Sequence, residues 1–298
     1  MRIFVTGASG FIGSAVVPEL LAAGHQVIGL ARSDRSAQNI LAAGAAVHYG
    51  SLDDLESLRT GAAAADGVIH LAYNHDFSQP QAAAQTDFQA VQTFGEVLKG
   101  SDRPLVIASG VVGLAPGRLA TEQDKSSTSA HPRFATAQAT LDLAQQGVRS
   151  SVLRLSPTVH GKGDPGFVAV LIQIARQKGV AGFIEEGNSR WPTVHRLDAA
   201  RLFRHAVEKA PAGSVLHGVA EEGVSQRDIA GVIGRHLGVP VASIPADQAA
   251  EHFGWLARFL SLDSRVSSTL TRELLDWEPT HPGLLEDLEE GHYFGVLA

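Results

Sequence analysis

The segment that decides the fold is Thr6-Gly7-Ala8-Ser9-Gly10-Phe11-Ile12-Gly13, near the start of a chain of 298 residues. A short apolar run precedes it, and a stretch with apolar residues at helical spacing follows it. Each glycine has a mechanical role, since Gly7 permits a tight turn, Gly10 lets the backbone approach a pyrophosphate, and Gly13 allows close packing of helix against strand. The segment predicts a phosphate-binding turn at a helix N-terminus, with a plain strand-to-helix turn as the alternative. The expected contacts are Gly7, Ser9, Gly10, Phe11, Ile12 and Gly13.

Beyond this turn, short β-branched runs alternate with Ala- and Leu-rich stretches, the pattern of βαβ units and a parallel sheet. The alternation predicts an α/β fold over residues 1–156, with a doubly wound Rossmann sheet and helices on both faces. The expected six strands are 3–6, 26–31, 46–49, 68–72, 105–109 and 151–155. The expected helices are 11–23, 34–43, 53–59, 81–99 and 132–146.

The alternation of β-branched and Ala- or Leu-rich stretches ends after Leu155, where a loop containing Gly and Pro begins. We expect residues 157–298 to form a smaller α+β substrate lobe over the carboxyl ends of the strands. Some segments could return to the first half, above all the helix at 199–210. The elements expected in this part are strands at 191–195 and 215–219 and helices at 167–178, 198–209, 225–237, 247–260 and 284–289.

The composition limits the classes of function. The 24 basic and 31 acidic residues form no long runs and give a formal net charge of −7, so we expect no nucleic-acid partner. The absence of cysteine excludes a thiolate nucleophile and a Cys-ligated metal, and no HExxH-like pair suggests a metal site. No secretion signal or apolar run of about 20 residues is visible, which predicts a cytoplasmic protein without a membrane partner. A homodimer is left open.

The end of the second predicted strand bears on cofactor choice. A carboxylate is common there in NAD sites because it binds the ribose 2′-hydroxyl, but this chain has Arg32 followed by Ser33. An arginine can pair with a 2′-phosphate through charge-assisted hydrogen bonds, with Ser33 and Arg35 as helpers, so we expect NADP(H) to be preferred over NAD(H). The competing interpretation is that Asp34 takes the ribose hydroxyls and favours NAD.

Further nucleotide contacts are expected where the later strands end. Asp53 follows the third strand and could contact adenine, although the N-cap of a helix is an equal alternative. Loops at the carboxyl ends of strands four to six surround the nicotinamide in this fold. On that basis the expected contacts are Leu71, Ala72, Ser109 and Pro157.

Five blocks of this sequence resemble the extended and atypical branches of the short-chain dehydrogenase/reductase superfamily, the NAD(P)-dependent epimerase/dehydratase and 3β-hydroxysteroid-dehydrogenase-like proteins. The blocks are TGASGFIG at 6–13, VIHLAY at 68–73, LVIASG at 105–110, VLRLSPTVHGKGD at 152–164 and WPTVHRLDAARL at 191–202. The resemblance implies a Rossmann fold, a bound nicotinamide nucleotide and a small-molecule pocket under the C-terminal lobe. It does not identify the substrate.

This sequence differs from the family pattern at the catalytic pair of residues. In the superfamily a Tyr-x-x-x-Lys pair on the helix after strand five donates the proton, but here Arg133 stands in the tyrosine slot and Ala137 in the lysine slot. Tyr49, Tyr73 and Tyr293 are the only tyrosines, and none has a lysine four residues later. The sequence therefore predicts that both catalytic residues are missing.

A replacement general acid must reach the developing alkoxide and have a suitable pKa. The candidates after strands four and five are Tyr73, His75 and Ser109, with His75 favoured because Asp76 beside it could hold the charged imidazole. A polar capping loop is the equal alternative for that pair. The candidates for substrate contact are Asn74, Asp76, Arg133, His160, Arg190 and Trp191. Asp198 is expected to be a helix N-cap.

Together these features predict an NADPH-dependent reductase of a small carbonyl, imine or activated alkene. One alternative is a non-catalytic NADP-binding redox sensor or regulatory protein, suggested by the missing pair. The other is a sugar-nucleotide-type epimerase or dehydratase, which needs the missing base more than a reduction does.

Overall fold

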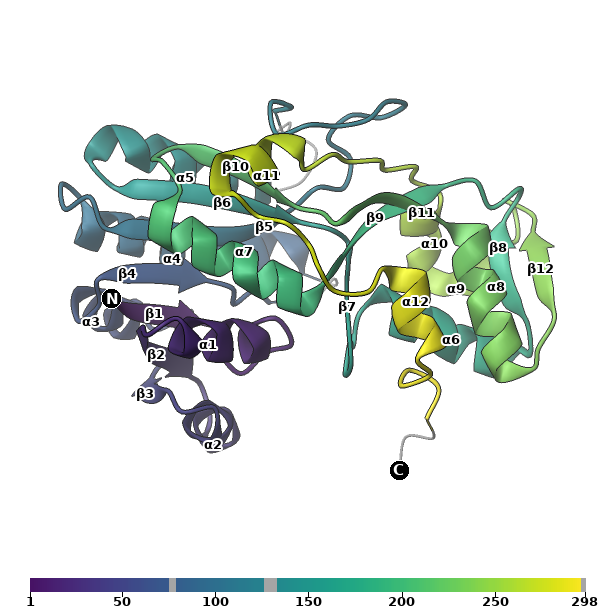
Figure 1. The fold of residues 1–298 in the computed structure, drawn as a ribbon, viewed down its shortest axis with the longest axis horizontal. Coiled ribbons are helices and arrows are strands. Elements are labelled where there is room, and N and C mark those ends of the chain that lie inside the picture. Colours follow the sequence, from purple (N-terminus) through teal and green to yellow (C-terminus); the bar gives the residue numbers. More distant parts are fainter. Residues whose placement is uncertain (75–78, 126–132, 296–298) are drawn as a thin grey trace.

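A seven-stranded parallel sheet forms the middle layer of one half of the molecule, and the C-terminal lobe lies beside this half (Figure 1). The computed structural model describes residues 1–74, 79–125 and 133–295. The strand order is β10-β6-β5-β4-β1-β2-β3, with the reversal beside β1 that is typical of a doubly wound sheet. The strands are β1 (Arg2–Thr6), β2 (Gln26–Ala31), β3 (Ala46–Tyr49), β4 (Gly67–His70), β5 (Pro104–Gly110), β6 (Arg149–Leu155) and β10 (Ser214–Gly218).

The sheet contains one strand more than the six expected. The sequence predicts a strand at 215–219 that crosses in the C-terminal lobe, but β10 pairs with β6 along its whole length, from Ser214 opposite Ser151 to Gly218 opposite Leu155. Pairing across more than sixty residues of chain leaves no local signal in the sequence.

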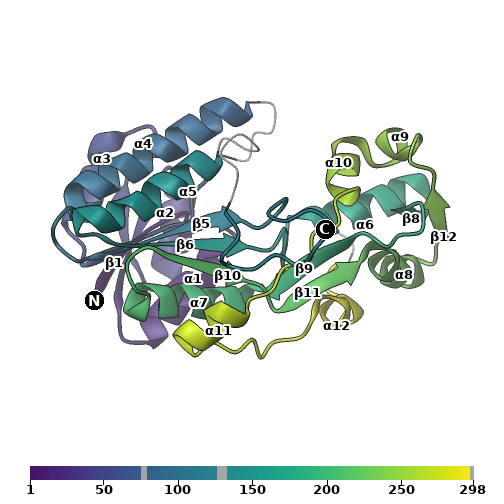
Figure 2. The same ribbon diagram turned by 90° about the horizontal axis from the view of Figure 1, so that it is seen from above.

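Helices cover both faces of the sheet, as predicted (Figure 2). One core lies under α1, α2 and α7 and includes Leu20, Ile40 and Phe203; the other lies under α3, α4 and α5 and includes Leu58 and Phe94. These helices are α1 (Gly13–Ala22), α2 (Asp34–Ala42), α3 (Leu55–Ala63), α4 (Pro80–Leu98), α5 (Arg133–Asp142), which continues as the 3₁₀ turn η1 (Leu143–Gln146), and α7 (Arg196–Lys209).

The C-terminal lobe has a core of its own and two small sheets of order β11-β9-β7 and β12-β8. The helix expected at 247–260 is broken, because Gly254 has φ +58° and ends the first segment. The elements of the lobe are β7 (Thr158–His160), α6 (Phe167–Lys178), β8 (Ala181–Ile184), β9 (Arg190–His195), β11 (Glu221–Ser225), α8 (Gln226–Leu237), β12 (Val241–Ile244), α9 (Ala249–Phe253), η2 (Gly254–Leu256), α10 (Ala257–Leu260) and α12 (Leu284–Glu289). Helix α11 (Thr269–Leu275) returns to the first half, where it packs against β10 and α7.

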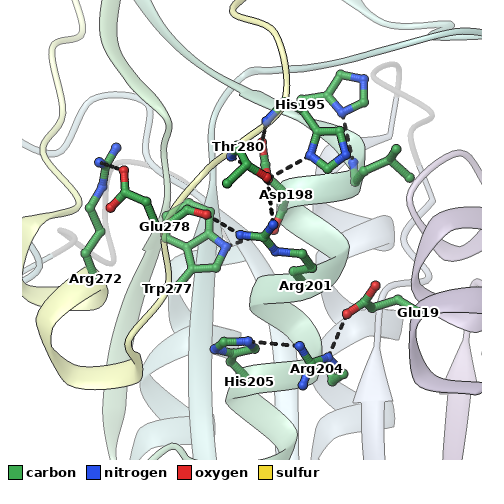
Figure 3. A network of polar contacts seen from close by, with 12 residues as sticks. Glu19, His195, Asp198, Arg201, Arg204, His205, Arg272, Trp277, Glu278 and Thr280 are labelled. Atoms are coloured by element: carbon green, nitrogen blue, oxygen red, sulfur yellow. Dashed lines mark hydrogen bonds and ion pairs between the residues drawn. The ribbon is translucent and has the colours of Figure 1, made fainter. Parts of the chain in front are cut away.

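Helix α7 follows β9 but lies against α1, where Arg204 donates to Glu19 at 2.6 Å (Figure 3). The expected N-cap, Asp198, is instead buried in the first turn and accepts hydrogen bonds from the backbone N–H groups of Thr280 and His281, both at 3.0 Å. The observed N-cap is His195. The carboxylate of Asp198 therefore fastens the C-terminal segment to α7.

Across the three described ranges, no helix combines the length and apolar character that a membrane crossing requires.

Candidate active site

The turn between β1 and α1 has the geometry that a bound pyrophosphate requires. Gly7 has φ +70°, and a side chain there would meet the backbone of Ala72, whose nitrogen would lie 2.8 Å from the added Cβ. A Cβ on Gly13 would lie 2.1 Å from the carbonyl oxygen of Gly7, so the helix could not approach the strand. Gly10 is exposed, and no described side chain caps the helix at Ile12. The N–H of Gly10 donates to the carbonyl oxygen of Gly7 at 3.0 Å and closes the turn, and the first N–H groups of a helix are available to bind an anion.

The end of β2 presents two cations at the side of this turn. Arg32 and Arg35 are exposed, and neither forms an ion pair within the described part of the chain. The side chain of Ser33 accepts from the N–H of Ser36 and so caps α2. Asp34 accepts a hydrogen bond from the Tyr49 hydroxyl at 3.4 Å. Ser33 therefore has a structural role, while the two arginines keep their donors for an incoming group.

Asp53, expected at the adenine, lies on the surface, whereas Leu71 and Ala72, expected near the nicotinamide, lie against the phosphate turn. Asp54, rather than Asp53, caps α3 by accepting from the N–H of Ser57, which corrects the N-cap alternative for Asp53. Asp53 itself accepts from Thr86 at 3.4 Å on the surface. Leu71 and Ala72 lie directly against the turn, because their N–H groups donate to the carbonyl and hydroxyl oxygens of Thr6, both at 3.2 Å.

The carboxyl ends of β4, β5 and β6 lie side by side in register, so the residues that follow them share one edge of the sheet. Ser109 is buried near the end of β5, and no described group bonds its hydroxyl. Pro157 is half-buried between β6 and β7, Tyr73 is half-buried after β4, and Asn74 beside it is exposed. His75 and Asp76 fall outside the described residues.

Arg133 begins α5 at this same edge and is held from three sides. Its Nη2 donates to the carbonyl oxygen of Ala108 at 2.9 Å. Its guanidinium carbon lies 4.0 Å from the ring centroid of Tyr73, and its Nε lies 3.9 Å from Oδ2 of Asp87. Burial raises the pKa of Tyr73, and the positive charge of Arg133 opposes that rise.

Sequence reasoning missed the residues behind Arg133. The Nε2 atom of His70 lies 3.1 Å from Oδ1 of Asp87, and its Nδ1 lies 2.7 Å from the Thr6 hydroxyl. Burial works against ionisation of Asp87, but the hydrogen bond to His70 and the charge of Arg133 outweigh it and lower its pKa. One signal was available, because Asp87 lies on the apolar face of α4, between Ala84 and Val91 at helical spacing.

Two of the other substrate-contact candidates, His160 and Trp191, are buried in the lobe, and a third, Arg190, is on its surface. His160 is fully buried and its Nδ1 lies 2.8 Å from Oδ2 of Asp287, which favours a structural role. Trp191 is buried as well, donates to the carbonyl oxygen of Phe259 and packs on Phe167. Arg190 is exposed at the start of β9. Of the candidates that the structure describes, Tyr73 and Arg133 are in contact, and Ser109 follows Ala108, whose carbonyl oxygen accepts from Arg133.

A family model described as the NAD dependent epimerase/dehydratase family matches residues 3–217. The chain belongs to this family. It is therefore a member of the extended short-chain dehydrogenase/reductase superfamily, as the five sequence blocks suggested.

Relatives in this family extend over the whole chain. An uncharacterized protein of Schizosaccharomyces pombe is 50% identical over 99% of this chain and 100% of its own. A ketoreductase of Stigmatella aurantiaca, which acts on 4-hydroxy-2-methyl-3-oxo-4-farnesyl-3,4-dihydroquinoline-1-oxide, is 29% identical over 85% of this chain and 80% of its own. Among solved structures, the UDP-glucose 4-epimerase of Thermotoga maritima with UDP-glucose superposes with a TM-score of 0.78, covering 99% of this chain and 98% of that one at 22% identity.

The residues present fit an NAD(P) cofactor. The deciding feature is the turn itself, since at Gly7 and Gly13 the backbone leaves no room for a Cβ, while Gly10 faces outward. Such a close-packed, outward-open turn at a helix N-terminus is what a pyrophosphate occupies in Rossmann folds. Together with the family match, this turn supports NAD(P) binding by the chain.

Proposed function

We propose that this family member is an NADPH-dependent reductase of a small carbonyl, imine or activated alkene. The observation that carries the proposal is the convergence of Arg133, Tyr73 and Ser109 at the edge of the sheet where β4 and β5 end, the edge that also carries the phosphate turn. The 29% identical relative is a ketoreductase, which supports a reduction rather than an epimerisation.

The preference for NADPH rests on Arg32 and Arg35. Both are exposed cations without an ion-pair partner in the described ranges, in a protein of net charge −7, and both follow the end of β2. A 2′-phosphate carries the charge that such a pair binds, whereas a ribose hydroxyl gains little from it.

The chemistry needs a positive charge and a proton beside the reacting carbonyl oxygen. A bound nicotinamide would supply the hydride, which goes to the carbonyl carbon while the carbonyl π electrons move to oxygen. Arg133 would stabilise the resulting alkoxide, and Ser109 would donate a hydrogen bond to the same oxygen. Tyr73 would give its proton to the alkoxide and regain one from solvent, with the nearby guanidinium stabilising the phenolate.

The proposal can be tested with a screen for NADPH oxidation over a panel of ketones, quinones, imines and activated alkenes. We expect substrate-dependent loss of NADPH absorbance, with turnover reduced about 100-fold in Tyr73→Phe and in Arg133→Ala and less in Ser109→Ala. NADPH affinity should stay within about twofold of the wild type in all three variants, because none of the residues touches the phosphate turn. A protein that binds NADPH but oxidises none of it across the panel is a sensor or regulatory protein instead.

A further inference from the structure

A buried series of polar groups runs from the sheet to Arg133. Thr6 on β1, His70 on β4 and Asp87 on α4 are each at most 2% exposed. The Thr6 hydroxyl lies 2.7 Å from His70 Nδ1, His70 Nε2 lies 3.1 Å from Asp87 Oδ1, and the second oxygen of Asp87 faces Arg133 Nε at 3.9 Å. The three groups form one continuous path through the apolar core around Phe94, whose ring lies edge-on to His70 with centroids 5.4 Å apart.

The hydrogen bonds fix the direction of this path. Thr6 Oγ1 already accepts the N–H of Ala72, and among the described groups its remaining contact is His70 Nδ1. A buried hydroxyl donates its hydrogen when it can, so Thr6 donates to Nδ1 and leaves the ring proton on Nε2. Nε2 of His70 then donates to Asp87. The carboxylate keeps its negative charge, which is turned toward Arg133.

Stability alone gives little reason for a carboxylate at this position. Asp87 lies on the apolar face of α4, and well-packed apolar side chains of similar volume often stabilise a core as well as a buried ion pair does. The ion pair with Asp87 instead orients the guanidinium of Arg133 at the edge of the sheet where β4 and β5 end. Three different neighbours surround the guanidinium: the Asp87 carboxylate, the Ala108 carbonyl and the face of the Tyr73 ring. The Ala108 carbonyl accepts a hydrogen bond, the Tyr73 ring lies against the guanidinium, and the Asp87 carboxylate acts through its charge at 3.9 Å. A planar, delocalised guanidinium suits this combination better than an ammonium does.

We propose that Asp87, backed by His70 and Thr6, is a positioning residue that holds Arg133 as the fixed cation of the active site, in the slot that the catalytic tyrosine occupies in related enzymes. This inference rests on the proposed reduction for its catalytic consequence. Its structural half, the fixing of Arg133 by Asp87, holds independently of which reaction the protein performs.

The structural half is tested by NMR on the NADP-bound full chain. In the wild type we expect the His70 ring to carry its proton on Nε2 and the Arg133 Nε–H to exchange slowly with solvent. Asp87→Asn keeps the size of the side chain and removes the charge, so Arg133 Nε–H should exchange faster. Asp287→Asn, at the other buried His–Asp pair, is the matched control and should leave the Arg133 signal unchanged. An unchanged Arg133 signal in Asp87→Asn overturns the proposal.

The catalytic half is tested with 9,10-phenanthrenequinone as the probe substrate. We expect kcat to fall about 100-fold in Asp87→Asn and in Arg133→Lys, while KM and NADPH affinity stay within about threefold. Millimolar guanidinium chloride should restore activity to Arg133→Ala and fail to restore it to the Asp87→Asn/Arg133→Ala double variant. Rescue in both variants, or a normal kcat in folded Asp87→Asn, contradicts the positioning role.

The outcomes separate this proposal from the proposed function. If the wild type oxidises no NADPH with any probe, the reductase fails, and the NMR comparison still decides whether Asp87 holds Arg133. If the wild type is active and Asp87→Asn is equally active with unchanged thermal unfolding, the reductase stands and the positioning role is wrong.

Discussion

Two buried His–Asp pairs, one in each half of the molecule, have nearly the same internal geometry and different surroundings. His70 and Asp87 lie 3.1 Å apart under α4, and His160 and Asp287 lie 2.8 Å apart between β7 and α12. The second oxygen of Asp87 faces a guanidinium at the edge of the sheet, whereas the second oxygen of Asp287 accepts from His292 at 2.9 Å. The group that contacts the second carboxylate oxygen, Arg133 in one pair and His292 in the other, therefore determines the role of each pair.

The second pair belongs to a closed cluster of histidines. The ring of His160 meets that of His195 edge-on with centroids 5.4 Å apart, and His195 stacks on His281 at 4.8 Å. His281 in turn bonds Asp198 on α7. This cluster links α12 and β7 of the lobe to α7 of the nucleotide-binding half, so its polar groups serve the assembly of the two halves.

The largest expected effect comes from breaking the second pair. Asp287→Ala leaves His160 and His292 without their acceptor, and removing one member of a buried pair costs about 3 kcal/mol. We expect the free energy of unfolding in urea to fall by about that amount, while kcat at a temperature where the variant is folded stays normal. A loss below about 1 kcal/mol would mean that the lobe does not depend on this pair.

Breaking the first pair's contact with its third partner should act on turnover. Arg133→Ala removes the cation from the edge of the sheet and is expected to lower kcat about 100-fold, equivalent to about 2.7 kcal/mol of transition-state stabilisation. Thermal unfolding and calorimetric NADPH titration serve as controls and should change little. If kcat survives and stability collapses, the two pairs have the same role and the comparison fails.

The histidine cluster should make stability depend on pH in a defined window. Burial, together with the nearby His160, lowers the pKa of His195 to about 4, against about 6.5 in an unfolded chain. Between these values the unfolded state binds a proton that the folded state does not, so stability falls as pH drops from about 6.5 to 4. Allowing for solvent screening, we expect a loss of about 2 kcal/mol. His195→Asn, which retains an acceptor for the start of α7, should flatten urea-unfolding stability across this window.

The smallest expected effect is on cofactor affinity, from a substitution at Arg32, which belongs to neither His–Asp pair. Arg32→Ala should weaken NADPH binding about tenfold and leave NADH binding unchanged, because only NADPH carries the 2′-phosphate. Calorimetric titration of both cofactors measures this, and Ser33→Ala is the matched control, since Ser33 caps α2. Equal losses for the two cofactors would remove the basis for an NADPH preference.

The two pairs also show how far the sequence could predict this molecule. The turn at 6–13 was predictable because its requirements are local: glycines at fixed spacing between a strand and a helix. The seventh strand was not, since β10 finds β6 only after the chain folds. His70 and Asp87 lie 17 residues apart on a strand and a helix, and their contact with Arg133 needs a third element, α5. Local patterns identify each residue's element but not its partners across the sheet.

A crystal structure of the protein with NADP bound would show directly whether Arg133 is the fixed cation beside the nicotinamide. We expect the 2′-phosphate on Arg32, the pyrophosphate over residues 6–13 and the nicotinamide ring beside Ser109, with the guanidinium of Arg133 still fixed by Asp87 and facing the reactive carbon of the ring. A complex in which Arg133 turns away from the nicotinamide, while the cofactor is otherwise fully bound, would contradict this expectation.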